Sequence, residues 1–354
     1  MLLFLGEFTG DAEAICPRGV LRRVLAQADA LGYNVSAALE YEFFLFNETP
    51  HSIREKGYKN LEPFTPDWFG YSVIRNSVHS ELYESMLKMG EDMDFPIEGL
   101  HTETGSGVIE AAISVDEALV AADKAALFKT FLKVWAQKHG KLATFMAKWS
   151  GDFPGQSGHI HVSLQNKAGQ SAFYAEDQAH NMSPIQQHFV AGQQQLMPEF
   201  LSMIAPTINS YTRMVPGYWA PTASTWGIEN RTTALRVIPG SSKSQRVEYR
   251  LGAADANPYL ALAAAVASGL HGIINKLQPT EPVKGNAYDQ EQDASLHLPS
   301  TLWDAAQRLK SSCAANTLLG EEFVNHFAAT REWEEREFRK HVTDWEMERY
   351  FEII

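Results

Sequence analysis

The feature that most constrains the fold of this chain is a set of ionisable side chains spaced two apart inside otherwise apolar segments. Three segments carry it: EYEFFLF (40–46), GHIHVSL (158–164) and RVEYRLG (246–252). Residues i and i+2 of a β-strand point to the same face of the sheet. Each segment therefore predicts a strand with one apolar face and one face of charged or imidazole side chains. The residues on the charged faces are Glu40 and Glu42, His159 and His161, and Arg246, Glu248 and Arg250.

A solvated sheet face is the ordinary explanation of any single such pair, because charged residues are mostly exposed. Three such strands count against it, since Glu, His and Arg stand here beside Phe43, Phe44 and Leu164, where a solvated face would favour Lys and Thr. A buried face that collects carboxylates needs cations to offset desolvation and repulsion. The pattern predicts a site for divalent cations, and its oxygen-rich, cysteine-free donors favour Mg²⁺ or Mn²⁺ over structural zinc.

A glycine turn at 105–107 adds further candidate ligands. Glu103 and Glu110 flank this turn, and Glu98 and His101 lie just before it. For His101 taken alone, a hydrogen-bonded histidine is favoured over direct contact with a metal.

Arginines are concentrated in the segment between residues 213 and 250. Bidentate guanidinium groups recognise carboxylate and phosphate, and an acidic metal site beside arginines is the arrangement that phosphoryl transfer requires. Structural ion pairs with Glu229 or Asp255 are the competing explanation for one or two of them. The chain has neither GxxxxGK[ST] nor GxGxxG, and no nucleophile elbow or Cys/His pair that would suggest a hydrolase. The arginines are Arg213, Arg231, Arg236, Arg246 and Arg250.

Composition narrows the class of protein and its partners. The chain has 354 residues and a net charge of −13, which argues against nucleic acid as a partner and favours small molecules. Two cysteines exclude a disulfide scaffold. The opening MLLFLGEF has no basic region, and the most apolar stretch, 259–270, is shorter than a membrane span. A cytoplasmic protein without a membrane partner is predicted.

Hydrophobic periodicity and turn signals predict an α+β fold with a curved, mainly antiparallel sheet flanked by helices. Neither an internal repeat nor a low-complexity stretch is present. Strands are expected near 34–46, 95–114 (two strands), 141–149, 158–164, 222–227, 232–237 and 246–251. Helices are expected near 17–32, 77–93, 116–139, 184–204, 258–276 and 300–340.

These segments resemble the glutamine synthetase family. No single short match decides this, but six occur in the family's order, which makes coincidence a poor explanation. The matches are EYEFFLF (40–46), EGLHTETGSGVIE (98–110), GHIHVSL (158–164), NSYTRMVPGYWAP (209–221), NRTTALRVIP (230–239) and RVEYRLGAADANPYLALAAA (246–265).

The resemblance implies that residues 1–354 are a glutamine synthetase-type catalytic domain. The implied reaction has two steps, in which ATP phosphorylates the γ-carboxylate of L-glutamate and ammonia or a primary amine then forms the amide. Two or more Mg²⁺ or Mn²⁺ ions are implied as cofactors, and the family's dodecamers imply a large homo-oligomer.

The resemblance also assigns roles residue by residue. Glu42, Glu103 and Glu110 would hold the metal nearer the substrate, and Glu40, His159 and Glu248 the metal among the ATP phosphates. Glu98, His161 and Ser163 match nucleotide-side positions, and Arg231, Arg236 and Arg246 match phosphate-side arginines, Arg231 as a catalytic residue. Gly155 and Arg213 match glutamate-binding positions, with Arg250 at the reacting γ-carboxylate as a catalytic and substrate-binding residue.

Two positions depart from the family pattern. The family motif VPGYEAP has a glutamate that binds ammonium, and this chain has Trp219 there. Trp cannot act as a base, but its ring can pack on an alkyl amine or offer a cation–π face. Trp219 therefore raises the alternative of a γ-glutamyl-amine ligase that does not use ammonia. Pro154 replaces the usual Asn before Gly155, which bears on the α-carboxylate and amino contacts.

A further departure is the lack of a match to the family's N-terminal β-grasp domain, which completes a neighbouring subunit's site. The interpretations are a fragment, a misplaced gene start or a truncated paralogue. A catalytically silent paralogue with a structural or regulatory role is the rival of another class, but every matched metal position is still Glu or His. A phosphotransferase acting on a guanidino substrate shares the chemistry but does not account for the ordered motifs.

Overall fold

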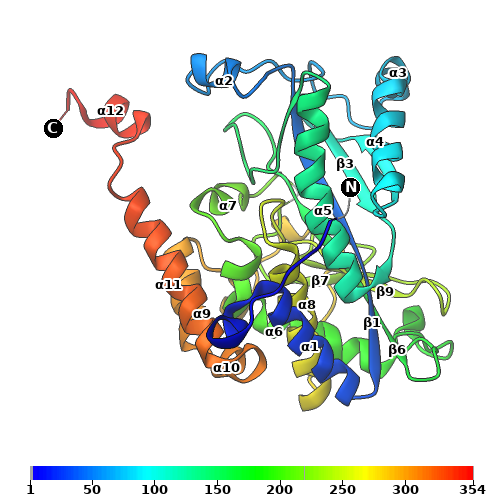
Figure 1. Cartoon of the computed structure of the whole chain (residues 1–354). Helices are drawn as coiled ribbons and strands as arrows, with labels where there is room; N and C mark the ends of the chain where they lie inside the picture. The colour runs from blue at the N-terminus through cyan, green and yellow to red at the C-terminus, as the bar shows by residue number, and fades with distance from the viewer. Residues whose placement is uncertain (1–2, 219, 354) are drawn as a thin grey trace.

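The computed structural model describes residues 3–218 and 220–353, which form one mixed sheet with helices around it (Figure 1). The sheet has nine strands, seven of them in the order β2-β3-β1-β6-β9-β8-β7, while β4 and β5 pair with β1. All neighbours are antiparallel except β7 and β8. The strands are β1 (Tyr33–Phe46), β2 (Ile97–Thr102), β3 (Val108–Ile113), β4 (Asp116–Glu117), β5 (Leu142–Thr144), β6 (Gly158–Asn166), β7 (Trp226–Ile228), β8 (Leu235–Ile238) and β9 (Arg246–Tyr249).

The helices lie before, between and after these strands. The α-helices are α1 (Pro17–Ala30), α2 (Ser52–Glu55), α3 (Val73–Val78), α4 (Ser80–Asp92), α5 (Ala118–Lys138), α6 (Pro184–Ile204), α7 (Ile208–Arg213), α8 (Pro258–Asn275), α9 (Leu302–Ser311), α10 (Cys313–Leu319), α11 (Glu321–Phe338) and α12 (Asp344–Tyr350). Short 3₁₀ helices are η1 (Gly10–Ile15), η2 (Ala179–Asn181), η3 (Ala287–Asp289) and η4 (Ala294–Leu296).

Strand β1 is the axis of the sheet and separates its two faces. From Val35 to Phe43 its residues alternate between buried and partly buried, as period 2 requires. Tyr41 and Phe43 point to the apolar face, where both rings lie 6.2 Å from the ring of Phe128 in α5. The other face of β1 carries Glu40 and Glu42.

The apolar face is covered by a helical layer in which α6 and α8 pack very closely. A Cβ atom on Gly272 of α8 would come within 1.9 Å of the carbonyl oxygen of His188 in α6. A Cβ atom on Gly192 of α6 would come within 2.1 Å of the carbonyl oxygen of Ser268. Glycine is therefore required where the two backbones meet.

The predicted α+β class with a mainly antiparallel sheet is confirmed, and so are most of its elements. The predicted strand 141–149 is shorter, because it pairs with β1 only as far as Leu142–Thr144. Beyond that point the N–H of Glu42 donates to Ser157 instead. The helix expected at 77–93 begins earlier and is broken at His79 into α3 and α4.

Helix α8 is long and apolar enough to cross a membrane by length and composition alone. Most of it is buried inside the protein, however, between α1, α5 and α6. It is a core helix in this structure.

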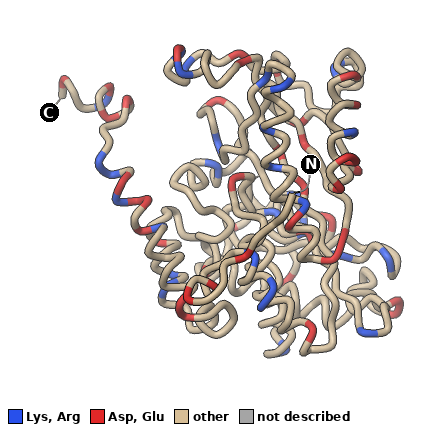
Figure 2. The backbone as a smooth tube through the Cα atoms, viewed as in Figure 1, with Lys and Arg blue, Asp and Glu red and all other residues tan. Residues whose placement is uncertain are grey.

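The C-terminal helices α11 and α12 extend away from the sheet (Figure 1). Basic and acidic residues follow one another along both helices (Figure 2).

Candidate functional site

The register of the sheet places ionisable side chains from neighbouring strands beside one another. Glu42 of β1 lies opposite Glu110 of β3, which in turn lies opposite His101 of β2. Two residues before Glu42, Glu40 lies opposite His159 of β6. These five residues form the acidic end of a charged row on one face of the sheet.

The row continues across β6, β9 and β8 and becomes basic. His161 lies opposite Glu248, and Glu248 lies opposite Arg236. Glu248 is almost fully buried and is flanked by two guanidinium groups: Arg236 Nη1 lies 3.0 Å from its carboxylate, and Arg250 Nη1 pairs with its other oxygen. Arg246 donates from Nε to His161 Nδ1 at 3.2 Å.

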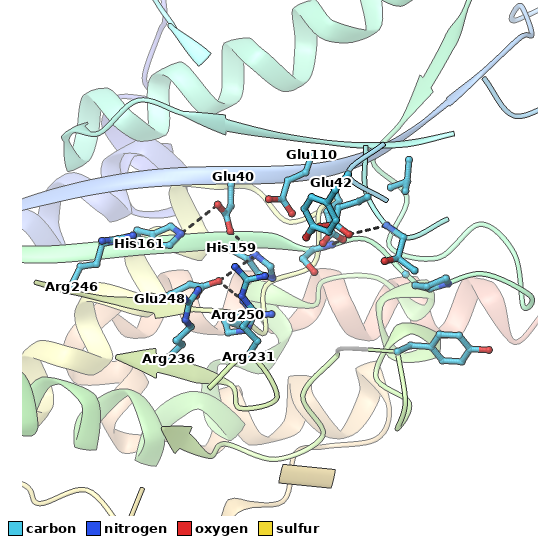
Figure 3. A pocket seen from close by; sticks show the side chains of 18 residues that line it. Glu40, Glu42, Glu110, His159, His161, Arg231, Arg236, Arg246, Glu248 and Arg250 are labelled. Carbon is cyan, nitrogen blue, oxygen red and sulfur yellow. Dashed lines mark hydrogen bonds and ion pairs between the residues drawn. The ribbon is translucent and has the colours of Figure 1, made fainter. Parts of the chain in front are cut away.

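The row lines a cavity of about 510 Å³. Figure 3 shows Glu40, Glu42 and Glu110 pointing toward the histidines from one side, with the arginines gathered on the other. Of the residues that the sequence singled out, the cavity lining includes Glu40, Glu42, Glu103, Glu110, Gly155, His159, His161, Arg231, Arg236, Arg246, Glu248 and Arg250.

One group of three potential metal ligands lies in the middle of the row. Glu40, His159 and Glu248 each offer an atom within 4.8 Å of the other two. His159 Nδ1 lies 2.8 Å from Glu40 and 3.5 Å from Glu248. Two carboxylates and one imidazole fit a divalent cation such as Mn²⁺ or Mg²⁺.

The surroundings of this group favour the ionised form of its two carboxylates. Burial alone would raise the pKa of Glu40, but hydrogen bonds with His159 and His161 outweigh it and hold that pKa well below its ordinary range. Burial also acts to raise the pKa of Glu248, but the charges of His159 and Arg250 lower it. Burial and Arg250 act to lower the pKa of His159, yet its bond to Glu40 and the charge of Glu248 raise it. Both carboxylates are therefore ionised near neutral pH.

A second group lies at the acidic end and consists of His101, Glu103 and Glu110, again with ligand atoms within 4.8 Å of one another. His101 Nε2 lies 3.3 Å from Glu110, and this hydrogen bond is the main cause of the raised pKa of His101. The structure thus places His101 beside two of the predicted ligands, and it shows the kind of hydrogen bond that the sequence favoured for this histidine.

Glu42 lies beside this second group but is held by a different contact. Its carboxylate accepts the backbone N–H of Ser157 at 2.7 Å. Burial and the neighbouring charge of Glu110 raise the pKa of Glu42. A nearby cation would offset both the burial of Glu42 and its repulsion from Glu110, and would therefore stabilise the ionised carboxylate.

Four of the residues that the sequence singled out lie outside the cavity lining: Glu98, His101, Ser163 and Arg213. Glu98 is exposed in β2 at a shift in register between Ile97 and Gly99, which turns it out of the row. Ser163 lies on the same face of β6 as His161 but further along, opposite Ser36. The predicted substrate residue Trp219 lies outside the described residues.

Arg213 is buried directly behind the wall of the cavity. Its stem packs on Gly155, where a Cβ atom would come within 2.5 Å of Arg213 Cγ. Its guanidinium donates to Ser157 Oγ and to the carbonyl oxygen of Leu251, both at 2.9 Å. Glycine at 155 is therefore explained by the close approach of an arginine.

The structure also brings in residues that sequence reasoning missed. Tyr71 lies in the loop before α3 and donates its hydroxyl to Glu103, and burial together with this bond raises the pKa of Tyr71 to about 12. Tyr218 also lines the cavity, with Lys148 Nζ 4.7 Å from its ring centre. Tyr71 comes from a loop without periodicity, so only the fold could place it.

A cavity that sets carboxylates and imidazoles beside arginines is typical of enzymes that handle phosphate groups with divalent cations. Comparison with known proteins makes the class specific. Residues 14–350 match the family model of the glutamine synthetase catalytic domain, and the chain belongs to the glutamine synthetase family. The family resemblance seen in the motifs is thereby confirmed, and the chain is an ATP-dependent ligase of the glutamine synthetase type.

Two curated relatives and one solved structure illustrate the similarity. Type-1 glutamine synthetase 2 of Dictyostelium discoideum is 45% identical over 99% of this chain and 68% of its own length. Glutamate--isopropylamine ligase of a Pseudomonas species is 37% identical over 100% of this chain and 77% of its own. A solved structure of GmaS without ligand has a TM-score of 0.85 and 28% identity, covering 96% of this chain and 77% of the other.

Proposed function

We propose that this ligase joins the γ-carboxylate of L-glutamate to a primary amine. The γ-phosphoryl group of ATP is transferred to a γ-carboxylate oxygen, which gives ADP and γ-glutamyl phosphate. The amine nitrogen then attacks the γ-carbonyl carbon, phosphate leaves with the C–O bond electrons, and the nitrogen loses a proton to yield the amide. The observation that carries the proposal is that two groups of candidate metal ligands adjoin arginines at one cavity.

The acidic end of the cavity would serve the metals. Bound Mg²⁺ or Mn²⁺ would neutralise the phosphate oxygens and the developing charge of the transferred group. The protein's own contribution is to keep Glu40 and Glu248 ionised and to fix the ligands by cross-strand contacts. The first metal would be held by Glu40, His159 and Glu248, and the second by Glu42, Glu103 and Glu110, with His101 beside them.

The basic end would serve the anionic groups of both substrates. Arg231, Arg236 and Arg246 would face the ATP phosphates, and Arg250 the γ-carboxylate of glutamate. Arg236 and Arg250 share the carboxylate of Glu248, which fixes both forks before any substrate binds. Preorganised cations of this kind stabilise charge in the transition state without reorganisation. Glu98, His161 and Ser163 remain proposed nucleotide-side residues, and Gly155 and Arg213 proposed glutamate-side residues.

The choice of an amine over ammonia rests on position 219. Trp in place of the family's ammonium-binding glutamate supplies an aromatic surface and no negative charge. Its neighbour Tyr218 lines the cavity, and one relative is named for its use of isopropylamine. Ammonia is the second candidate acceptor, because the relative with 45% identity is named as a glutamine synthetase.

The acceptor is tested by measuring ATP- and glutamate-dependent phosphate release with ammonia, methylamine, isopropylamine, ethanolamine and putrescine in parallel. An amine ligase should show kcat/KM for at least one amine above that for ammonia by about tenfold or more. A clear preference for ammonia contradicts the choice of an amine and leaves the ligase assignment in place.

The metal roles are tested by Glu103→Ala and Glu248→Ala. Each variant should lose metal-dependent turnover while retaining its fold by circular dichroism, because an oxygen ligand is removed from each group. Glu55→Ala is a matched control, since Glu55 is exposed and pairs only with His51 among the described residues. Activity in either cavity variant equal to that of the control would refute the assigned metal role.

Three further predictions complete the proposed function. The protein would be cytoplasmic, and would assemble as a large homo-oligomer after the family's dodecamers. That residues 1–354 form one catalytic domain, with the family's N-terminal β-grasp domain outside it, stays a prediction.

A further inference from the structure

We infer that Asp255 is a positioning residue of this ligase: it fastens α7, which ends in Arg213, to the segment that begins with Arg250. These two arginines are the glutamate-side arginines of the proposed function, on which the inference rests. Asp255 itself does not line the cavity and would not contact substrate. It lies in the connection between β9 and α8.

The carboxylate of Asp255 is the acceptor for the first turn of α7. Thr207 Oγ1 donates to Asp255 Oδ2 at 2.7 Å, and Ser210 Oγ donates to the same oxygen at 3.2 Å. The same two hydroxyls accept backbone N–H groups, Thr207 from Ser210 and Ser210 from Thr207, in the capping box of α7. Each hydroxyl has one proton, so donation to Asp255 leaves its lone pairs for the backbone.

The other end of α7 is tied to the same connection. Arg213 Nη1 donates to the carbonyl oxygen of Leu251, the residue that follows Arg250. Helix α7 is therefore fixed at its start by Asp255 and at its end by Leu251. Arg250 is held in turn by its ion pair with Glu248. Arg213 and Arg250 are therefore positioned by the same stretch of chain, from the end of β9 to Asp255.

Two positive charges act on Asp255 against the effect of burial. Lys129 and Arg213 both act to lower the pKa of Asp255, although burial, the larger effect, raises it. Lys129 Nζ also donates to the carbonyl oxygen of Ala256 at 2.7 Å, and Arg331 donates to that of Pro206, just before α7. Basic side chains from two helices thus converge on the joint between α7 and the connection.

The consequence for catalysis is selective. The ATP-side arginines Arg236 and Arg246 lie on β8 and β9, and among the described residues no hydrogen bond joins either of them to α7. Loosening α7 should therefore weaken the binding of L-glutamate and leave ATP and metal binding almost unchanged. A defect that merely lowered stability would affect both substrates alike.

The test uses the full chain with the variant Asp255→Ala, which removes the acceptor of both hydroxyls. The KM for L-glutamate should rise about tenfold, while the KM for ATP stays within about twofold. Amide hydrogen exchange of residues 208–213 should become faster in the same variant. Thr207→Val, which leaves Asp255 in place, should change both readouts in the same direction.

Asn257→Ala is the matched control in the same connection. The side chain of Asn257 caps α8 by accepting the backbone N–H groups of Tyr259 and Leu260, and among the described residues it makes no hydrogen bond to α7. It should lower the melting temperature without changing the KM for L-glutamate. Equal effects of Asp255→Ala and Asn257→Ala on that KM would overturn the inference, as would unchanged hydrogen exchange in α7 in Asp255→Ala.

A failure of the proposed function gives a different result. If the wild-type protein releases no phosphate with L-glutamate, the proposed substrate is wrong. Amide hydrogen exchange in α7 then remains the test of the positioning role of Asp255. Faster exchange in Asp255→Ala than in Asn257→Ala would then still support the positioning role, and equal exchange would overturn it.

Discussion

Lys129 offers the sharpest quantitative prediction, because it is an ammonium group enclosed by the core. It lies on α5 with Nζ 5.2 Å from the ring centre of Tyr41 and 5.6 Å from that of Phe145. Burial lowers the pKa of Lys129 from its ordinary 10.5 to about 7. The charged groups that face it are Asp255, which opposes this decrease, and Lys133, which adds to it.

The sign of the effect on stability follows from proton binding. Because the pKa is lower in the folded state, the unfolded chain binds more protons between pH 7 and 10.5, and the free energy of unfolding rises with pH in that window. Below pH 7 the penalty reaches about 5 kcal/mol, and at pH 9 about 2 kcal/mol remains. Lys129 should therefore make the protein about 3 kcal/mol less stable at pH 6 than at pH 9.

Lys129→Met removes the charge and keeps an unbranched side chain of similar length. The variant loses the hydrogen bond to Ala256, which costs about 1 to 3 kcal/mol and offsets part of the gain. Its stability should exceed that of the wild type most at pH 6, and the difference should shrink as the pH rises to 9. Urea unfolding followed by tryptophan fluorescence, at equal protomer concentration from pH 6 to 9, measures it. If the free energies of unfolding of the two proteins differed by the same amount at every pH from 6 to 9, the reasoning would be refuted.

Three further outcomes follow from the packing and the site. Gly272→Ala should lower the melting temperature by several degrees or more, because its Cβ would meet the carbonyl of His188 at 1.9 Å, whereas Gly151→Ala, with open space around it, should not. Adding Mn²⁺ should raise the melting temperature, by an amount corresponding to about 3 kcal/mol at a hundredfold excess over Kd, and Glu248→Ala should abolish the increase. The pKa of His159 is raised, so Mn²⁺ affinity by calorimetry should increase with pH until that pKa is passed and then level off; a flat profile from pH 5.5 to 8.5 would contradict the role of His159.

Local sequence patterns were enough to predict much of the fold. The helix at 184–204 and the hairpin around 105–107 agree with α6 and with β2–β3, because apolar periodicity and turn glycines act over short distances. The pattern in β1 also predicted that Glu40 and Glu42 share a face. These elements needed no information from distant parts of the chain.

Which strands become neighbours could not be read from the patterns. The contact of Glu42 with Glu110 and of Glu248 with both Arg236 and His161 depends on strand order and register. The short helix α7 was also missed, since six residues give too little periodicity. Such features depend on tertiary packing and not on local preference.

The charged row that serves the proposed chemistry also fixes the fold of the sheet. A shift of β1 by one residue would exchange its faces. Glu40 and Glu42 would then stand against the helical layer, and Tyr41 and Phe43 would enter the cavity. Burying two carboxylates without partners costs several kcal/mol each, whereas the native register gives Glu40 a histidine and Glu42 a backbone N–H. The same alternation that builds the site therefore excludes the nearest incorrect register, so a substitution such as Glu40→Leu would affect strand pairing as well as the metal ligands.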